Sequence, residues 1–483
     1  MMKIERTSTG IIIHQPSMDI KRRCLRYFSL KDPIREYFIY SGNESDKKPI
    51  FGIEHDVIYI TSGFMCLKDS YIQSLKWTIR DIKPRDGKNV SVTMNRNPRS
   101  QLQNDCIDNI VKSNKPKITI EVKPGVGKTF MALYAISKLG KKPLIVAPTT
   151  LLKNQWIENL TDLGIDKEDI ATRISDSPNK TFTVVTITSI ENALRDDWKG
   201  LMDTIDKADF GIKIVDEAHL HMKGLLKFDA ICNIKRNWYL SATLGRSDQD
   251  EDRILNRALL DAERFVGSAK YEEYRDEYIN IYLQDIHYNA SRALCEQHFK
   301  YGKKGLISAT YYRMLMDYRM GNPFYSNIIR MVKIADKIKE KDTKVVVLLP
   351  LLDAIREVIN RMKQDDYFKN VKISMVDGSM SISEKRKALE NDLILSTTAS
   401  LGTGVDVMNL GAVVNFDQKS SLIILEQMVG RLRNRGFETY YIDVCDHVKY
   451  AKAFQKWGIK RRQAMNYFPG VHKEMKRLPD IRC

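Results

Sequence analysis

Apolar residues in this sequence gather in short runs that alternate with longer amphipathic stretches. Residues 118–122 form one such run, and the stretch 130–139 that follows has helical spacing. Because buried strands separated by helices pack as βαβ units, this alternation between about 91 and 250 predicts a parallel sheet. Further strands of the sheet are expected at 144–147, 181–185, 212–215 and 238–240.

The same alternation returns between about 326 and 450. It predicts a second parallel sheet, and therefore an α/β fold with two lobes in tandem, 91–250 and 326–450. The strands of the second sheet are expected at 344–349, 371–375, 393–396 and 412–416.

Residues 1–90 are predicted to form a small N-terminal accessory domain that contains β-strands. The runs at 37–40 and 57–60 are rich in β-branched and aromatic residues, which favours strands. The polar stretch 81–88 contains Pro and Gly and is typical of a turn or linker.

Two further segments lie outside the lobes. Residues 251–325 alternate weakly and are predicted to be a helical connector or insertion, with one candidate strand at 279–283. The tail 451–483 holds nine Lys and Arg residues against two acidic ones, so it is a candidate phosphate-binding appendage. The alternative for the tail is a solvated terminal helix.

Composition excludes several classes of protein. With 43% hydrophobic and 29% charged residues, the 483-residue chain resembles neither a disordered nor a collagen-like protein. Its seven single Cys residues, its lack of an apolar secretory segment and its lack of an 18-residue apolar run favour a cytoplasmic protein without a membrane anchor. A net charge of +17 suits a polyanionic partner, although an inert basic surface would give the same value.

A glycine-containing segment between a predicted strand and a predicted helix has the features of a phosphate-binding loop. Glycines let backbone N–H groups face phosphate oxygens, and the start of the helix favours negative charge. Lys128 is expected at the β- and γ-phosphates, while Val122 stands where the full pattern has Gly. The candidate nucleotide-binding residues here are Gly125, Val126, Gly127, Lys128, Thr129 and Phe130.

Two adjacent carboxylates, Asp216 and Glu217, follow the predicted strand 212–215. Asp216, together with Thr129, is a candidate ligand of Mg²⁺. Glu217 is expected to orient and deprotonate an attacking water. The alternative is a solvated acidic pair at the start of a helix.

Asp216-Glu217-Ala218-His219 matches the DEAH signature of superfamily 2 helicases. Further segments resemble that family's motifs in the family's order, over about residues 99 to 435. They are Arg99 and Gln103 (the adenine-reading Q motif), Ala147-Pro148-Thr149 with Gln155-Trp156 (motif Ia), 186–189 (motif Ib), Ser241-Ala242-Thr243 (motif III), 346–349 (motif IV) with 377–380, 396–397 with 402–406 (motif V), and 427–431 (motif VI). The amino-acid sequences of the segments 146–149 and 240–244 are most similar to those of the UvsW-type branched-DNA helicases of tailed phages.

This resemblance implies two RecA-like lobes that bind ATP and Mg²⁺ between them. It adds Gln103, Gly404 and Asp406 to the nucleotide site, and it gives Arg431 the role of an arginine finger. The family's second arginine falls on Asn434, so Arg433 is the substitute.

The resemblance also implies contacts of Thr149, Thr186 and Thr397 with the nucleic-acid backbone. For each threonine the alternative is a helix cap after a strand. Coupling between the nucleotide and the nucleic acid is expected to pass through His219, Ser241, Thr243 and Gln427.

The function predicted from these features is an ATP-dependent DNA helicase or translocase. By resemblance, its substrate is forked or junction DNA in replication, recombination or repair, and its partners include proteins of those processes. A monomer in the cytoplasm, which is the host's if the source is viral, is expected. The alternatives are an RNA helicase, a duplex translocase that does not separate strands, a non-catalytic nucleic-acid-binding scaffold, and a metabolic kinase with the same loop.

Overall fold

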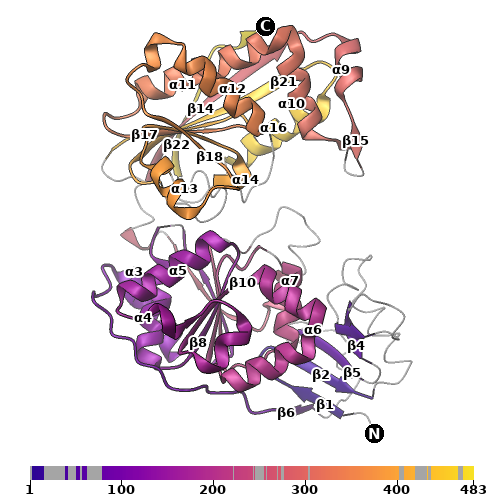
Figure 1. Ribbon diagram of the computed structural model, residues 1–483, viewed down its shortest axis with the longest axis vertical. Helices are drawn as coiled ribbons and strands as arrows, with labels where there is room; N and C mark the ends of the chain where they lie inside the picture. The colour runs from indigo at the N-terminus through magenta and orange to yellow at the C-terminus, as the bar shows by residue number, and fades with distance from the viewer. Residues whose placement is uncertain are drawn as a thin grey trace. The chain divides into compact units, whose positions relative to one another are not determined.

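The computed structural model divides the chain into two units, 1–271 and 272–483, which are drawn in Figure 1. Each unit is described by itself. The residues that the structure describes are 3–15, 39–41, 50–54, 57–61, 79–123, 125–220, 222–242, 244, 255–256, 258–268, 270–272, 277–302, 305–401, 407–418, 432, 437–465 and 471–483.

The first unit is built on a sheet of seven strands, all of which pair in parallel. Figure 1 shows α3, α4 and α5 on one side of its strands, and α6 and α7 on the other. In spatial order the strands are β13 (Glu263–Val266), β7 (Lys117–Glu121), β12 (Arg236–Ser241), β11 (Ile212–Val215), β8 (Pro143–Ala147), β10 (Phe182–Thr186) and β9 (Ile170–Ala171). The helices are α3 (Gln101–Lys112), α4 (Lys128–Leu139), α5 (Thr150–Asp162), α6 (Ile187–Ala208) and α7 (Met222–Ile231).

The second unit has a sheet whose pairings are also all parallel. Its order is β18 (Ile373–Val376), β19 (Leu393–Ser396), β17 (Lys344–Leu348), β20 (Leu410–Asn415), β21 (Thr439–Val448), β14 (Glu277–Tyr288) and β22 (Val471–Arg477), with β23 (Ile481–Arg482) beside β14. Its helices are α9 (Arg292–His298), α10 (Ser308–Asp317), α11 (Asn322–Ile338), α12 (Leu352–Lys363), α13 (Ile382–Leu389), α14 (Thr398–Leu401) and α16 (Lys452–Met465).

These two parallel sheets confirm the predicted α/β class with two lobes. Every strand that the apolar runs predicted for the lobes is present within two residues of its expected bounds. The reason is that both faces of a parallel sheet are covered by helices, so its strands must be apolar throughout. Val346 and Ile394, for example, are almost fully buried.

The N-terminal β region is a sheet of six strands attached to the first unit. Its order is β3 (Ile39–Ser41), β4 (Ile50–Glu54), β5 (Val57–Thr61), β2 (Gly10–His14), β1 (Lys3–Arg6) and β6 (Ile79–Asp81). Ile11 and Ile13 share a hydrophobic core with Phe228 of α7. Thr9 Oγ1 also donates a hydrogen bond of 2.8 Å to the carbonyl of Cys232, so this sheet packs directly on α7.

The stretch 81–88, predicted to be a turn or linker, is bonded tightly to the first unit. The amide of Arg85 donates to the carbonyl of Asn233 at 3.0 Å. Gly87 has φ +76°, and a Cβ there would lie 2.1 Å from the backbone nitrogen of Gly211. This close backbone approach requires glycine, and it fixes the path of the chain into the first sheet.

The segment 251–325, predicted to be a helical connector, supplies strands to both sheets. β13 pairs with β7 in the first unit. β14 is a strand of 12 residues that lies between β21 and β22 in the second unit. The candidate strand at 279–283 is therefore the middle of a longer element, and α9 and α10 follow it.

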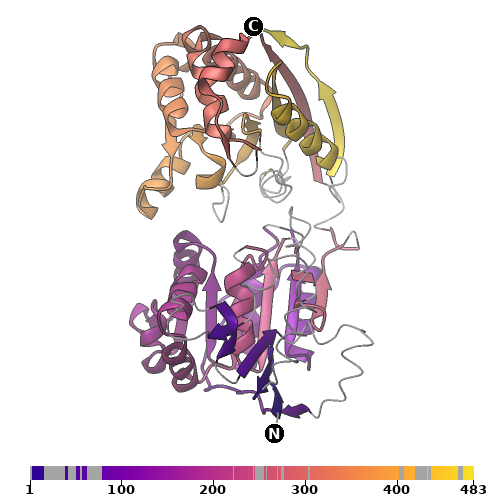
Figure 2. The same ribbon diagram turned by 90° about the vertical axis from the view of Figure 1, so that its right-hand side faces the viewer.

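The basic tail 451–483 is part of the second sheet. α16 packs on β21, and β22 and β23 pair with β14, as the yellow segments of Figure 2 show. Arg461 of α16 is 1% exposed, and its Nε lies 2.7 Å from Asp443 Oδ1. Arg462 Nε lies 3.0 Å from Asp443 Oδ2. These two cations stabilise the sheet and are not available to phosphates.

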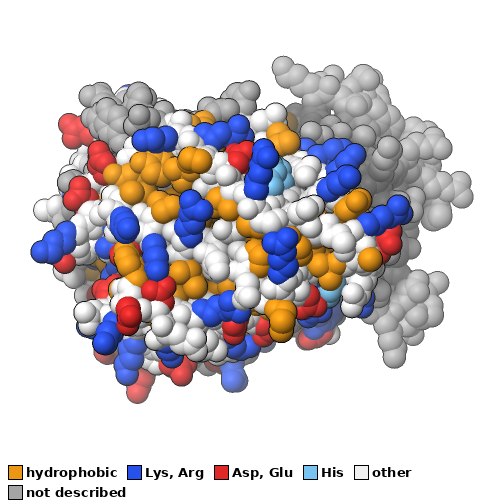
Figure 3. Space-filling view, turned by 90° about the horizontal axis from the view of Figure 1, so that it is seen from above, with side chains coloured by type: hydrophobic (Ala, Val, Ile, Leu, Met, Phe, Trp, Pro, Cys, Tyr) orange, Lys and Arg blue, Asp and Glu red, His pale blue; other side chains and the backbone are white. Residues whose placement is uncertain are grey.

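Basic side chains are also visible on the surface. On the face drawn in Figure 3, Lys and Arg side chains are spread among hydrophobic and uncharged ones. No helix within the described ranges is both long enough and apolar enough to cross a membrane.

We expect Arg461→Met to destabilise the second unit by about 3–5 kcal/mol, because it breaks a buried ion pair and leaves carbonyls unpaired. Arg461 also donates to the carbonyls of Asp417 and Val444, at 3.0 and 3.1 Å. Urea unfolding of the whole chain, followed by far-UV circular dichroism, measures the change. Lys460→Met, at an exposed position of the same helix, is the control. Equal stability of the two variants would contradict the structural role.

Candidate nucleotide-binding site

The glycine loop connects β7 to α4. Gly125 and Gly127 have φ values of +82° and +99°, in the left-handed region. A Cβ on Gly127 would lie 2.8 Å from Gln103 Nε2. Both glycines are thus required by the backbone path, and the loop ends where the first N–H groups of α4 are free to bind an anion. Pro124 lies outside the described residues.

Two residues that precede the loop hold its backbone. The side chain of Gln103, in α3, donates through Nε2 to the carbonyl of Val126 at 2.7 Å and accepts the amide of Arg99 at 2.9 Å. Arg99 Nη2 donates to the carbonyl of Gly125 at 3.0 Å. Gln103 is 2% exposed. In this structure its amide group therefore supports the loop.

The departure at Val122 from the glycine pattern has a structural explanation. Val122 directly follows β7, is fully buried, and has no left-handed backbone. Its amide donates to the carbonyl of Ser241, and its own carbonyl accepts Lys128 Nζ at 3.1 Å. Nothing in this position requires glycine. Thr129 and Phe130 lie in the first turn of α4.

Asp216 follows the fully buried strand β11, and its carboxylate is held at both oxygens. Its amide donates to the carbonyl of Val146, which continues the pairing of β11 with β8. Oδ1 accepts the amide of Glu217 at 3.0 Å, and Oδ2 accepts Nε1 of Trp156 at 2.9 Å. Sequence reasoning placed Trp156 in motif Ia but gave it no role.

Glu217 has a backbone φ of +46°, which is uncommon for a residue with a side chain. The turn is fixed by the amide of Ala218, which donates to Leu240, and by that of Leu220, which donates to Glu217. Backbone strain of this kind concentrates at functional sites. The Glu217 carboxylate is 18% exposed, and its Oε2 lies 3.4 Å from His219 Nδ1.

The two carboxylates Asp216 and Glu217 are only partly compensated by the positive charge of Lys128. Burial, together with the negative charge of Glu217, raises the pKa of Asp216 to about 6, while the Trp156 hydrogen bond and the charge of Lys128 act in the opposite direction. Oε2 of Glu217 is buried without a hydrogen bond among the described residues. Two adjacent carboxylates, one buried and one partly exposed, suit a hard cation with oxygen ligands, so the donor set fits Mg²⁺.

His219 and Ser241, two residues of the predicted coupling set, are in contact. His219 Nδ1 is 2.7 Å from Ser241 Oγ, and both side chains are fully buried. This contact joins the turn after β11 to the end of β12. The neighbouring Thr243 lies outside the described residues.

The three threonines predicted to contact nucleic acid all act as helix caps. Thr149 Oγ1 accepts the amide of Leu152 at the start of α5, and Thr186 Oγ1 accepts that of Ser189 at the start of α6. Thr397 Oγ1 accepts the amide of Ser400 beside α14. Thr149 follows β8 and Thr186 is the last residue of the neighbouring parallel strand β10, so both lie at the carboxyl end of the first sheet. Their contact with nucleic acid stays a prediction.

The other predicted site residues fall outside the described parts of the chain. They are Gly404 and Asp406 of the nucleotide site, Gln427 of the coupling set, and the finger candidates Arg431 and Arg433.

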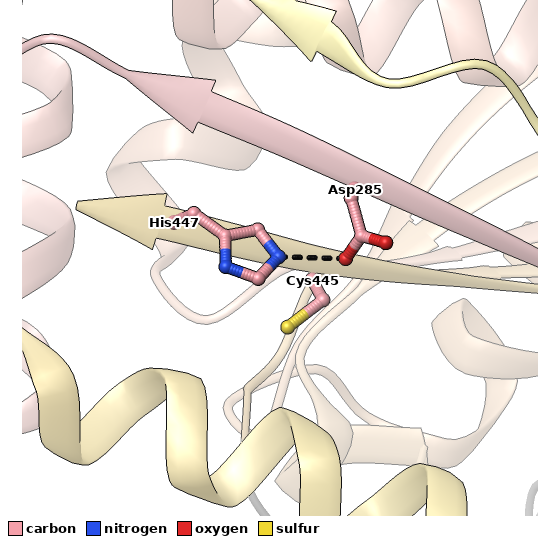
Figure 4. A group of neighbouring side chains, drawn as sticks. All are labelled: Asp285, Cys445 and His447. Carbon is pink, nitrogen blue, oxygen red and sulfur yellow. Dashed lines mark hydrogen bonds and ion pairs between the residues drawn. The ribbon is translucent and has the colours of Figure 1, made fainter. Parts of the chain in front are cut away.

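A second polar cluster lies in the other unit, where Asp285, Cys445 and His447 have ligand atoms within 4.8 Å of one another (Figure 4). Asp285 Oδ1 lies 2.6 Å from His447 Nε2 and accepts Arg462, while Oδ2 accepts Arg477. Burial raises the pKa of the Cys445 thiol to about 12, so it is protonated. Two guanidinium groups and a neutral thiol oppose a bound cation. The cluster instead bonds β14, β21, β22 and α16 together.

Two family models match this chain. "Type III restriction enzyme, res subunit" matches residues 97–246, and "Helicase conserved C-terminal domain" matches 326–436. Together the two matches cover most of the two predicted lobes, in the order of the motifs. The chain belongs to the superfamily 2 helicases, which confirms the resemblance at that level.

Two viral relatives are similar to this chain. "Transcript termination protein A18" of Yaba-like disease virus is 23% identical over 66% of this chain and 66% of its own length. "Putative ATP-dependent RNA helicase L396" of Acanthamoeba polyphaga mimivirus is 24% identical over 67% of this chain and 59% of its own length. The chain thus spans less than two thirds of the length of each relative.

Solved structures also match. A structure of Mss116p bound to single-stranded RNA and AMP-PNP has a TM-score of 0.52 at 15% identity, over 79% of this chain and 74% of that one. This likeness shows the fold. The crystal structure of T4 UvsW is aligned over 99% of this chain and 100% of that one, at 16% identity, with a TM-score of 0.34, which is too low to support an argument.

Proposed function

We propose that this protein is a nucleic-acid-stimulated ATPase that uses ATP hydrolysis to unwind or branch-migrate forked and junction DNA. The observation that carries the ATPase part is the adjacent pair of the buried Asp216 and the partly exposed Glu217 after strand β11, with the charge of Lys128 acting on Asp216. Membership of the superfamily 2 helicases supports the coupling of hydrolysis to nucleic acid.

In this proposal each residue has a defined task. Lys128 leaves the carbonyl of Val122 and binds the β- and γ-phosphates, which the loop amides and the start of α4 also bind. Thr129 and Asp216 would hold Mg²⁺, which when bound neutralises phosphate charge. Glu217 orients the attacking water and accepts its proton, and His219 with Ser241 connects Glu217 to the end of β12.

The choice of DNA rests on the resemblance of 146–149 and 240–244 to the UvsW-type helicases. An RNA helicase is the second candidate, because a similar mimivirus protein carries that name. Hydroxyl groups and helix N-termini at the edge of the first sheet would bind the backbone of either nucleic acid without reading sequence. The monomeric state, the cytoplasmic location and partners in replication or recombination stay predictions from the sequence.

The test is the steady-state ATPase rate, measured alone and with single-stranded DNA, duplex DNA, a four-way junction and structured RNA. We expect the junction to give the largest stimulation, and Lys128→Ala to show none. Larger stimulation by RNA would favour the RNA helicase. Stimulation without strand displacement would indicate a duplex translocase. Basal turnover that no nucleic acid changes would contradict the proposal.

A further inference from the structure

Trp156 makes an unusual contact for a core side chain. It lies on α5, is 1% exposed, and donates its indole N–H to Asp216 Oδ2 at 2.9 Å. An indole N–H can only donate, so it favours the ionised form of a carboxylate, in which both oxygens are acceptors only. A buried hydrogen bond to a charged group is stronger than a neutral one, and it fixes the orientation of both partners.

A second tryptophan, on an element of the first sheet, gives an internal comparison. Trp238 of β12 is fully buried, and its Nε1 has no hydrogen-bond partner among the described residues. Burial of an indole in this unit therefore does not by itself require a hydrogen bond to a carboxylate. The bond from Trp156 to Asp216 is a specific feature of its position and does not follow from burial alone.

The helix that carries Trp156 begins at a candidate nucleic-acid contact. Thr149 caps α5, and Trp156 lies seven positions further along, about two turns away. Leu152, Trp156 and Leu160 form the buried face of this helix. The helix is therefore a rigid element with the polar Thr149 at one end and the Asp216 carboxylate bonded to its second turn.

The backbone supports the same connection. β8 leads directly into α5, and its Val146 carbonyl accepts the amide of Asp216 at 2.9 Å. Asp216 is thus joined to the β8–α5 segment by two separate hydrogen bonds, one from its amide and one to its side chain. These two bonds tie the position of the carboxylate to that of the β8–α5 segment.

We propose that Trp156 is a positioning residue that orients the Asp216 carboxylate toward the Mg²⁺ of a bound nucleotide and couples that orientation to the start of α5. The proposal deepens the proposed function and rests on it, since Asp216 is there a metal ligand. Partners that orient a metal ligand affect metal affinity by about 10- to 100-fold when they are removed.

The test compares Trp156→Phe with Trp238→Phe, each in the whole chain. Binding of a fluorescent ADP analogue is measured in EDTA and then during a titration with Mg²⁺. We expect Trp156→Phe to raise the half-saturating Mg²⁺ concentration by about 10-fold and to leave binding in EDTA unchanged. Trp238→Phe is expected to change neither value. An unchanged Mg²⁺ midpoint in Trp156→Phe would overturn the proposal.

A second substitution separates the hydrogen bond from the packing. Trp156→His keeps an N–H donor on a smaller ring, so it should restore much of the Mg²⁺ midpoint that Trp156→Phe loses. If the two variants have the same raised midpoint, the indole acts only through packing and the inference fails. This comparison holds even if both variants are less stable than the wild type.

Coupling to nucleic acid is a separate readout. The ratio of stimulated to basal ATPase should fall several-fold in Trp156→Phe and stay at the wild-type ratio in Trp238→Phe. An equal ratio of stimulated to basal ATPase in the two variants would contradict the proposed coupling between the Asp216 carboxylate and the start of α5. If the wild-type protein itself binds nucleotide without any Mg²⁺ dependence, the proposed function fails instead, so the two failures are distinguishable.

Discussion

Glu217→Gln is expected to retain ATP binding and to lose turnover by about 10²- to 10⁴-fold. The amide has the size of the carboxylate and still accepts a hydrogen bond, but it cannot take a proton from water. Glu217 is suited to this task because its carboxylate is only partly exposed and its Oε2 has no hydrogen bond within the described structure. Single-turnover hydrolysis and nucleotide binding, measured on the same preparation, check both parts.

The control for this substitution is Glu168→Gln. Glu168 is an exposed residue of the same unit and lies in a short 3₁₀ helix, so the change removes the same charge without touching the site. Turnover at the wild-type rate in Glu217→Gln would show that another group accepts the proton.

Lys128→Ala is expected to reduce ATP hydrolysis by about 10²- to 10³-fold, and to weaken nucleotide binding as well. In the structure its ammonium donates to the carbonyl of Val122 at 3.1 Å, and its charge lowers the pKa of Asp216. Its loss removes a phosphate ligand and leaves the Asp216–Glu217 pair with less compensation. The measurements are the steady-state ATPase rate and nucleotide affinity.

Lys138→Ala is the matched control for Lys128→Ala. Lys138 lies in the last turn of the same helix, where its Nζ is 5.4 Å from the centroid of the Tyr134 ring. Its replacement should leave hydrolysis unchanged. Equal rates in the two variants would refute the assignment of the loop.

The central strands and the backbone path of the glycine loop can be predicted from the sequence for a physical reason. Buried parallel strands must be apolar on both faces, so runs such as 393–396 are recognisable. The left-handed backbone of Gly125 and Gly127 excludes most other residues, so the loop also has a local signature. In both cases the information lies within a few consecutive positions.

Strand β21 shows where this reasoning stops. It is a central strand, but it contains Asp443, Asp446 and His447, and no apolar run predicts it. Asp443 is buried because Arg461 and Arg462, from a later helix, pair with it. Charge compensation between distant segments has no local pattern, so the sequence does not show that Arg461 and Arg462 of the basic tail are held by Asp443.

The contacts of the site also cannot be predicted from the sequence. The Trp156 bond to Asp216 joins residues 60 positions apart, and Trp156 is otherwise an ordinary apolar position of a helix. Val122 departs from the glycine pattern, yet its backbone is not left-handed and therefore does not require glycine there. In both cases only the three-dimensional path of the chain distinguishes the alternatives.

The position of β14 determines where this chain can be divided for the study of its parts. A fragment cut at the matched residues 326–436 would contain β17 to β20 but would lack β14, β21 and β22. Its sheet would then end at β20, a strand of six buried residues, with an unpaired edge that invites aggregation. A recombinant second unit should therefore begin near residue 272, where the chain enters β14, and retain 471–482.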